Sequence, residues 1–245
     1  MSTQRNDNII NNLKMENERL KKELEEVRNE QIEYLQNVSH QLVAPLNAIK
    51  WHIENLTEGR YHNIERINKV LRSIYSQATI SVHLAKNFAL MSNLAADHKL
   101  SQLRERPESV HLCRLMVNLA DDFQPLAWDK DIRIIVINDP LDKAPEVMLI
   151  KNLISQVFSN IIENAIKYSR SGSKTLIDGS YDLDNKSVTV NVSSEGLPLP
   201  DGDINQIFIR GFRSEAACNL YPAGTGFGLF IAKKIVGIHD GKILA

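Results

Sequence analysis

Apolar side chains recur at spacings of three and four residues along the start of the chain. Polar Asn17 and Gln31 also fall on this stripe, and polar residues at the core of a heptad pattern fix coiled-coil register at some cost in stability. A single amphipathic surface helix is the alternative, but a pattern sustained for four heptads favours a dimeric coiled coil. The stripe consists of Ile10, Leu13, Asn17, Leu20, Leu24, Val27, Gln31, Tyr34 and Val38.

The helical stripe continues to Leu56 and is then followed by a second helical pattern. Pro45 removes one helical hydrogen bond and predicts a bend in the first helix. Residues 57–63 break the pattern, and heptad spacing over residues 67–88 predicts a second helix. Two antiparallel helices bury too little apolar surface alone, so we expect two hairpins to pair as a four-helix bundle in a dimer.

Beyond residue 108 the long helical patterns give way to short mixed elements. The expected elements are helices at 112–119, 149–168 and 227–238, and strands at 132–137, 175–181, 187–192 and from 242. Strands with helices segregated to one side form an α/β sandwich. The fold class expected for the whole chain is α+β, with an N-terminal coiled coil and an antiparallel helical hairpin followed by an α/β sandwich.

The distribution of helix breakers supports this division into two architectures. Of the 11 glycines, only Gly59 precedes Gly172, and Pro45 is the only proline before Pro107. A long stretch nearly free of glycine and proline is expected to be helical, whereas a glycine-rich region needs turns and loops.

Charge and hydropathy exclude several classes of function. The formal net charge of −1 provides no basic field for nucleic acid. No apolar run approaches the length of a membrane span, and the polar start is not a signal peptide. Cys113 and Cys218 are isolated in the sequence. We therefore expect a cytoplasmic protein with no nucleic-acid partner and no membrane segment in this chain.

Two features of the sequence carry candidate chemistry on helices. His40 lies off the apolar stripe of the first helix, where a lone histidine is usually only a surface residue. Asn160, Asn164 and Lys167 are spaced by four and three residues and so share one helix face. Two amides and an ammonium aimed the same way can hold a hydrated magnesium ion and phosphates. Amides that cap a nearby loop are an equally good interpretation of this spacing.

A glycine-rich segment, GTGFGL at residues 224–229, immediately precedes the last expected helix. Alternating glycines let the backbone approach a phosphate, and a helix N-terminus supplies free amides and a positive dipole end. The spacing fits neither a dinucleotide-binding fingerprint nor a Walker loop. Alone, this segment indicates either a phosphate site or a tight turn.

Taken together, five segments resemble in order the motifs of the sensor histidine kinase catalytic core. They are a phosphoacceptor box, VSHQLVAPL (38–46), an asparagine box, NIIENAIKYS (160–169), a first glycine box, SEGLPL (194–199), a phenylalanine box, IFIRGFRS (207–214), and a second glycine box, GTGFGL (224–229). The resemblance implies a coiled-coil signal helix (1–37), a dimerisation and histidine phosphotransfer hairpin (38–105) and a GHKL-type ATP-binding domain of Bergerat fold (106–245).

The resemblance also implies the roles of individual residues. His40 would be the phosphoacceptor, Asn164 would coordinate magnesium, and Asn160 and Lys167 would assist with phosphate. The implied activity is ATP-dependent autophosphorylation of His40 and phosphoryl transfer to an aspartate on a response regulator receiver domain, in a homodimer controlled by an upstream sensor module or protein. The implied nucleotide-binding residues are Asn160, Asn164, Lys167, Tyr168, Ser194, Gly196, Phe208, Phe212, Gly224, Thr225, Gly226, Gly228 and Leu229.

Several residues depart from the family pattern. Gln41 replaces the usual acidic neighbour of the histidine, and Ala44 replaces a threonine or asparagine. In the first glycine box, Ser194 replaces an aspartate and Pro198 replaces a glycine. The chain also ends at Ala245, inside the expected strand, which suggests a truncated ATP-binding domain.

These departures motivate an alternative function, a degenerate kinase that serves as a dimeric signalling scaffold. Another ATPase of the same nucleotide fold is a third interpretation, against which the helical hairpin argues.

Overall fold

The structure, a computed structural model, describes residues 2–95, 106–222 and 224–245, without the side chains of residues 2–13, 30–31, 33–34 and 92–95. The chain divides into two units, residues 1–40 and 41–245. Within the described ranges, no helix has both the length and the apolar character needed to cross a membrane. Four stripe positions, Ile10, Leu13, Gln31 and Tyr34, have side chains outside the described residues.

Helix α1 (Ser2–Thr57) forms the described part of the first unit and extends into the second. Its stripe residues Leu20, Leu24 and Val27 are 55, 69 and 46 % exposed. The predicted helix is therefore confirmed, and an apolar row is left open to solvent on it. Such a row is suited to cover by another chain, although the coiled coil itself stays a prediction.

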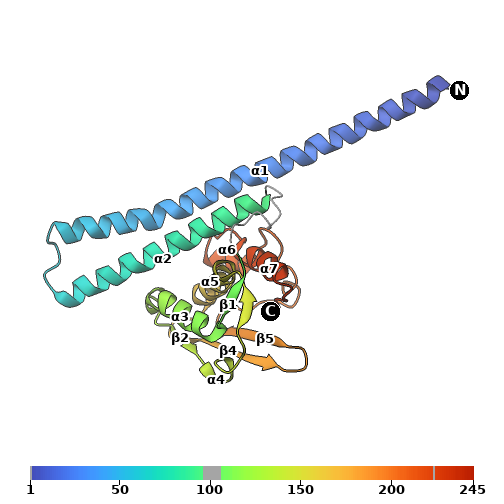
Figure 1. The fold of residues 1–245 in the computed structure, drawn as a ribbon. Helices are drawn as coiled ribbons and strands as arrows, with labels where there is room; N and C mark the ends of the chain where they lie inside the picture. Colours follow the sequence, from blue (N-terminus) through green and yellow to red (C-terminus); the bar gives the residue numbers. More distant parts are fainter. Residues whose placement is uncertain (1, 96–105, 223) are drawn as a thin grey trace. The chain divides into compact units, whose positions relative to one another are not determined.

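In the second unit, the end of α1 and helix α2 (Ile64–Ala95) lie antiparallel, as the hairpin pattern predicted (Figure 1). Gly59 has a φ of +66° and ends α1, because its amide bonds the carbonyl of Leu56 while the amide of Arg60 bonds that of Asn55. Asn63 caps the start of α2 by accepting a bond from the amide of Glu65 at 2.7 Å. Residues 57–63, which interrupt the helical pattern, therefore cap the end of α1 and the start of α2.

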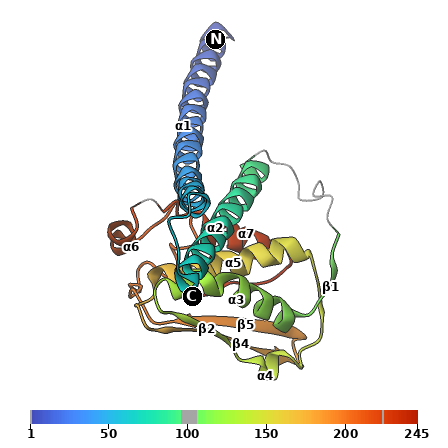
Figure 2. The same cartoon turned by 90° about the vertical axis from the view of Figure 1, so that its left-hand side faces the viewer.

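A three-stranded sheet lies under three helices in the rest of this unit (Figure 2). Its strand order is β2 (Arg133–Val136), β4 (Lys174–Asp182), β5 (Ser187–Ser194), with β2 parallel and β5 antiparallel to β4. Helices α3 (Leu112–Trp128), α5 (Lys151–Tyr168) and α7 (Gly228–Ile238) cover one face. This architecture confirms the expected α+β class.

The core forms where the apolar faces of these helices meet the sheet. Met116 of α3, Ile162 of α5, Ile231 of α7 and Ile177 of β4 are all fully buried. The helical spacing of apolar residues in α3 and α5 places them on the side that faces the sheet. Packing of α5 between α3 and α7 therefore fixes which of its polar residues remain beside a cavity.

Some elements differ from those predicted. The chain forms a second sheet by antiparallel pairing of β1 (Glu108–Val110) with β3 (Val147–Leu149), and short helices α4 (Asn138–Leu141) and α6 (Glu215–Leu220) are additional. The strand expected from Lys242 is wrong, because residues 241–245 have no regular secondary structure. A short apolar run becomes a strand only where another strand pairs with it.

A close approach at Gly196 predicts a stability effect. A Cβ at Gly196 would collide with the carbonyl oxygen of Tyr168 and lie 2.7 Å from the Cα of Ser169, whereas a Cβ at Gly202 would have nothing within 4 Å. We expect Gly196→Ala to lower the free energy of unfolding by about 1–3 kcal/mol through overpacking, with little change for the control Gly202→Ala. Urea denaturation of both variants checks this, and equal midpoints would contradict it.

Candidate functional site

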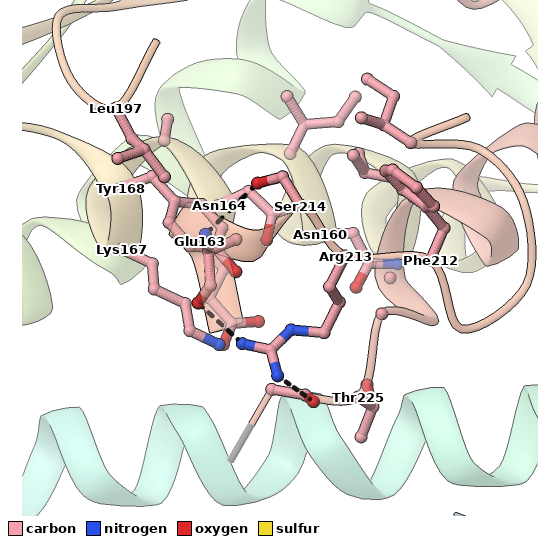
Figure 3. Close-up of a pocket in the computed structure, with 18 of the residues that line it drawn as sticks. Asn160, Glu163, Asn164, Lys167, Tyr168, Leu197, Phe212, Arg213, Ser214 and Thr225 are labelled. Carbon is pink, nitrogen blue, oxygen red and sulfur yellow. Dashed lines mark hydrogen bonds between the residues drawn. The ribbon is translucent and has the colours of Figure 1, made fainter. Parts of the chain in front are cut away.

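A cavity of about 360 Å³ lies between α5, the end of β5 and the loop that leads into α7. This volume lies within the range of small-molecule sites. Figure 3 shows side chains from α5 and from the 212–225 segment converging on it. Residues that line it include Gln41, Asn160, Asn164, Lys167, Tyr168, Ser194, Phe212, Arg213, Gly224, Thr225, Gly226, Gly228 and Leu229.

Helix α5 contributes the polar wall of the cavity. Asn160, Asn164 and Lys167 all line it, as their shared helix face predicted. Asn160 is only 1 % exposed, and its Nδ2 has no hydrogen-bond partner among the described residues. An unsatisfied buried donor is destabilising by about 1–3 kcal/mol. A ligand acceptor, such as a phosphate oxygen, would satisfy this amide.

The glycine-rich segment brings its backbone close to this wall. Gly226 has a φ of +69°, and a Cβ there would lie 2.7 Å from the carbonyl carbon of Gly211. A Cβ on Gly228 would lie 3.2 Å from Oδ1 of Asn160. Because α7 begins at Gly228, its first amides, which have no partner within the helix, lie beside the cavity. The segment is therefore both a tight turn and a helix start at the cavity.

Two cationic side chains, Arg213 and Lys130, bond backbone carbonyls near the cavity. Arg213 donates from Nη1 to the carbonyls of Pro222 and Gly224, each at 3.0 Å, and from Nη2 to that of Ala217 at 2.8 Å. Lys130 donates to the carbonyl of Lys167 at the end of α5, at 2.6 Å. These cations hold the backbone around the cavity in place.

Their charges also act on Lys167. Burial lowers the pKa of Lys167; Glu163 raises it, and the positive charges of Arg213 and Lys130 lower it further. The net direction is downward, so the charged ammonium lacks enough compensating negative charge. An anion bound in the cavity would supply that charge.

Glu163, which is partly buried and lines the cavity, pairs with the buried His83. The Nε2 of His83, on α2, lies 2.8 Å from Oε2 of Glu163, on α5. Burial by itself raises the pKa of Glu163, but the His83 hydrogen bond and the nearby charges of His83 and Lys167 outweigh it and lower the pKa. The carboxylate is therefore held in its ionised form.

Most but not all predicted site residues meet at the cavity. Gly196 and Phe208 lie outside its lining: Gly196 packs against the backbone of Tyr168 and Ser169, and Phe208 is buried with the ammonium of Lys233 5.4 Å from its ring centroid. The packing around Gly196 and Phe208 explains the presence of both residues without a contact to the cavity. His40 is exposed on α1, in the first unit. The ligand roles of all these residues stay predictions.

Sequence reasoning missed four residues that the structure places around the site. Arg213 follows Phe212 within the phenylalanine box, so its position there was the available signal. Lys130, His83 and Asn87 belong to no motif. Asn87 donates from Nδ2 to Oδ1 of Asn160 at 2.8 Å. Only tertiary packing brings Asn87 to the cavity, and places His83 and Lys130 against residues of α5.

Comparisons with known proteins agree with this geometry. Residues 150–245 match the family described as histidine kinase-, DNA gyrase B- and HSP90-like ATPase. The chain is 29 % identical over 223 residues to the sensor histidine kinase WalK of Bacillus subtilis (strain 168), covering 91 % of this chain and 35 % of that protein. It is 27 % identical over 223 residues to the sensor protein kinase WalK of Staphylococcus aureus, covering 91 % and 52 %.

The chain is also similar to solved structures. The crystal structure of full-length ShkA in complex with AMPPNP has a TM-score of 0.51 and 20 % identity, covering 87 % of this chain and 43 % of ShkA. This similarity supports the fold. The catalytic domain of histidine kinase ThkA has a TM-score of 0.49 and 26 % identity, covering 56 % and 85 %. The chain spans between a third and about half of the length of the WalK relatives.

The lowered pKa of Glu163 predicts a pH dependence of stability. Its contribution is present above the ordinary pKa of about 4.5 and is lost as the pH falls through the lower pKa of the folded state. We expect the free energy of unfolding to fall more steeply below pH 4.5 for wild type than for Glu163→Gln. Urea titrations over that pH range measure this. Parallel pH profiles would contradict it, and exposed Glu108→Gln is the control.

Proposed function

Because these relationships support a sensor histidine kinase catalytic core, we propose that this chain transfers the γ-phosphoryl group of ATP to His40. The phosphoryl group then passes to an aspartate on a response regulator receiver domain. The observation that carries the proposal is the cavity, which unites the asparagine box, the phenylalanine box and the second glycine box within a segment similar to ATPases.

Different cavity residues contact the phosphates and the magnesium ion of the nucleotide. The amide of Asn160 and the ammonium of Lys167 bond phosphate oxygens, which satisfies an orphaned donor and a buried charge. The backbone at Gly224, Gly226 and Gly228 allows the phosphates to approach the start of α7. Asn164 holds a hydrated Mg²⁺ ion, which supplies neutralisation of phosphate charge when bound.

In the phosphoryl transfer step, an imidazole nitrogen of His40 forms a bond to the γ-phosphorus while the bond to the β,γ-bridging oxygen breaks and ADP leaves. Such a step depends mostly on positioning and charge stabilisation. Gln41 cannot take up the imidazole proton that the usual acidic neighbour would accept, so this proton leaves to water. General-base assistance is worth about 10²–10⁴-fold, so autophosphorylation should be slow.

The partners in this proposal follow from the helical part of the chain. The exposed row of Leu20, Leu24 and Val27 on α1 forms a coiled coil in a homodimer. An upstream sensor module or protein acts through this helix, and His40 on the same helix meets the response regulator. Ala44 lacks the side chain that would orient water, so dephosphorylation of the regulator should be poor.

The kinase proposal predicts a labelled histidine. We expect incubation with ATP labelled on its γ-phosphate to give acid-labile, alkali-stable label on wild type and none on His40→Ala. Asn164→Ala should lower the rate at least about tenfold, because charge neutralisation at the phosphates is lost. His62→Ala, an exposed histidine of the hairpin loop, is the matched control and should label normally. Label that persists in His40→Ala would refute the assignment.

Calorimetry with ATP and magnesium separates this function from the scaffold alternative. Gln41, Ala44, Ser194 and Pro198 favour a degenerate protein. A kinase must bind ATP, whereas a scaffold need not. Heat of binding in wild type that is reduced in Asn164→Ala supports the kinase, and no binding supports the scaffold.

The dimer proposal predicts different effects of charge on and off the stripe. Leu24→Glu should raise the dimer dissociation constant at least about tenfold, since each buried leucine is worth about 1.5–3 kcal/mol and 1.4 kcal/mol is tenfold. Met15, 63 % exposed and off the stripe, provides the matched variant Met15→Glu. Analytical ultracentrifugation measures both, and equal dissociation constants would contradict the coiled coil.

A further inference from the structure

Tyr221 is the C-cap residue of α6, in the segment between the phenylalanine box and the second glycine box. Its ring centroid is 4.9 Å from the ammonium nitrogen of Lys130 and 5.3 Å from that of Lys167. Both distances fall within the range of cation–π contacts, in which the electron-rich face of an aromatic ring attracts a positive charge. Tyr221 is not among the described residues that line the cavity, whereas Lys167 is. The ring therefore reaches the site through Lys167.

Two contacts fix the position of the Tyr221 ring. Lys130 donates to the carbonyls of Ile166 and Lys167 at 3.2 and 2.6 Å, so its ammonium is held at the end of α5. The ring of Tyr168 meets that of Tyr221 edge to face, with centroids 5.9 Å apart and planes at 85°. Lys130 and Tyr168 thus give the ring a defined place beside the ammonium of Lys167.

Arg213 holds the backbone that carries this ring. Its Nη2 donates to the carbonyl of Ala217, within α6, and to the carbonyl of Tyr221 itself. A helix as short as α6, Glu215–Leu220, has little stability of its own and depends on such tertiary contacts. The bonds of Arg213 therefore tie α6 and Tyr221 to the phenylalanine box, whose last residues line the cavity.

The ammonium of Lys167 lies among charges of both signs. Burial lowers its pKa most, Glu163 on the same helix raises it, and the charges of Arg213 and Lys130 lower it. Figure 3 shows the side chain of Lys167 extending from α5 toward that of Arg213. A ring face stabilises a cation without adding a negative charge that would repel a phosphate. Tyr221 is thus suited to hold the ammonium while its N–H groups remain available to an anion.

We propose that Tyr221 is a positioning residue of the nucleotide site, whose ring holds the charged ammonium of Lys167 in place for the phosphates. This inference rests on the proposed function, because it takes the cavity as the ATP site and Lys167 as a phosphate ligand. The quadrupole of the ring attracts the cation, and the hydroxyl of Tyr221 has no part in this role. Removing the ring weakens binding of the phosphates, whereas removing the hydroxyl leaves binding unchanged.

Three substitutions test this role. Tyr221→Leu removes the ring and keeps an apolar side chain, and Tyr221→Phe keeps the ring and removes the hydroxyl. Tyr61→Leu is the matched control, because Tyr61 in the hairpin loop also has a cation over its ring, with Cζ of Arg66 5.4 Å from the centroid. Calorimetry of the full chain with MgATP gives the dissociation constants, and urea denaturation shows whether each variant is folded.

We expect Tyr221→Leu to raise the dissociation constant for MgATP by about twofold to thirtyfold, the range that a partly buried cation–π contact allows. Tyr221→Phe and Tyr61→Leu should each bind MgATP like wild type. In a Lys167→Ala background Tyr221→Leu should have no further effect, because the two changes remove one interaction. Binding by Tyr221→Leu should also weaken at a lower pH than binding by wild type, between about pH 7 and 9.5, since the ammonium without the ring loses its proton more easily.

Three results would overturn this role of Tyr221 while leaving the kinase proposal intact. They are an unchanged dissociation constant in folded Tyr221→Leu, equal weakening by Tyr221→Phe and Tyr221→Leu, and an equal effect of Tyr221→Leu with and without Lys167, which shows that the ring only packs the segment. Should Lys167→Ala abolish binding, the pH profile of Tyr221→Leu decides, and a profile parallel to that of wild type overturns the role. If wild type itself binds no MgATP, the proposed function fails and the role of Tyr221 with it.

Discussion

The buried side-chain amide of Asn160 needs a hydrogen-bond partner for its oxygen and another for its nitrogen. It is 1 % exposed on α5, its oxygen accepts a bond from Asn87, and its nitrogen has no partner in the described part of the chain. A buried amide is tolerated only when its hydrogen bonds are made. The glycine-rich segment packs closely against this amide. A Cβ on Gly228 would lie 3.2 Å from the side-chain oxygen of Asn160.

Electrostatics reinforce the same arrangement. Lys130 and Arg213 are both bonded to backbone carbonyls, at the end of α5 and in the loop before α7. These bonds place both positive charges close to Lys167. Burial and the two charges together lower the pKa of Lys167. Negative charge from Glu163 offsets this only in part, and that carboxylate is already bonded to His83. The cavity is consequently suited to an anion.

The sequence predicted the long helices, the hairpin of β4 and β5, and the shared helix face of Asn160, Asn164 and Lys167. These features depend on local spacing, which sets the face of a helix and the side of a strand. It did not predict the pairing of β1 with β3, whose strands are only three residues each. Nor could it separate Gly196 and Phe208 from the cavity lining, because a motif does not show what packs against each residue.

By itself, then, the sequence determined where the long helices lie, which of their faces are apolar, and the order of the motifs, because each follows from neighbours within a few residues. Tertiary structure alone decided which side chains share the cavity. Asn87 and Asn160 are 73 residues apart, as are His83 and Gln156, and no local pattern joins them. The physical reason is that periodicity specifies a face to be covered, whereas the packing of the complete domain selects the helix that covers it.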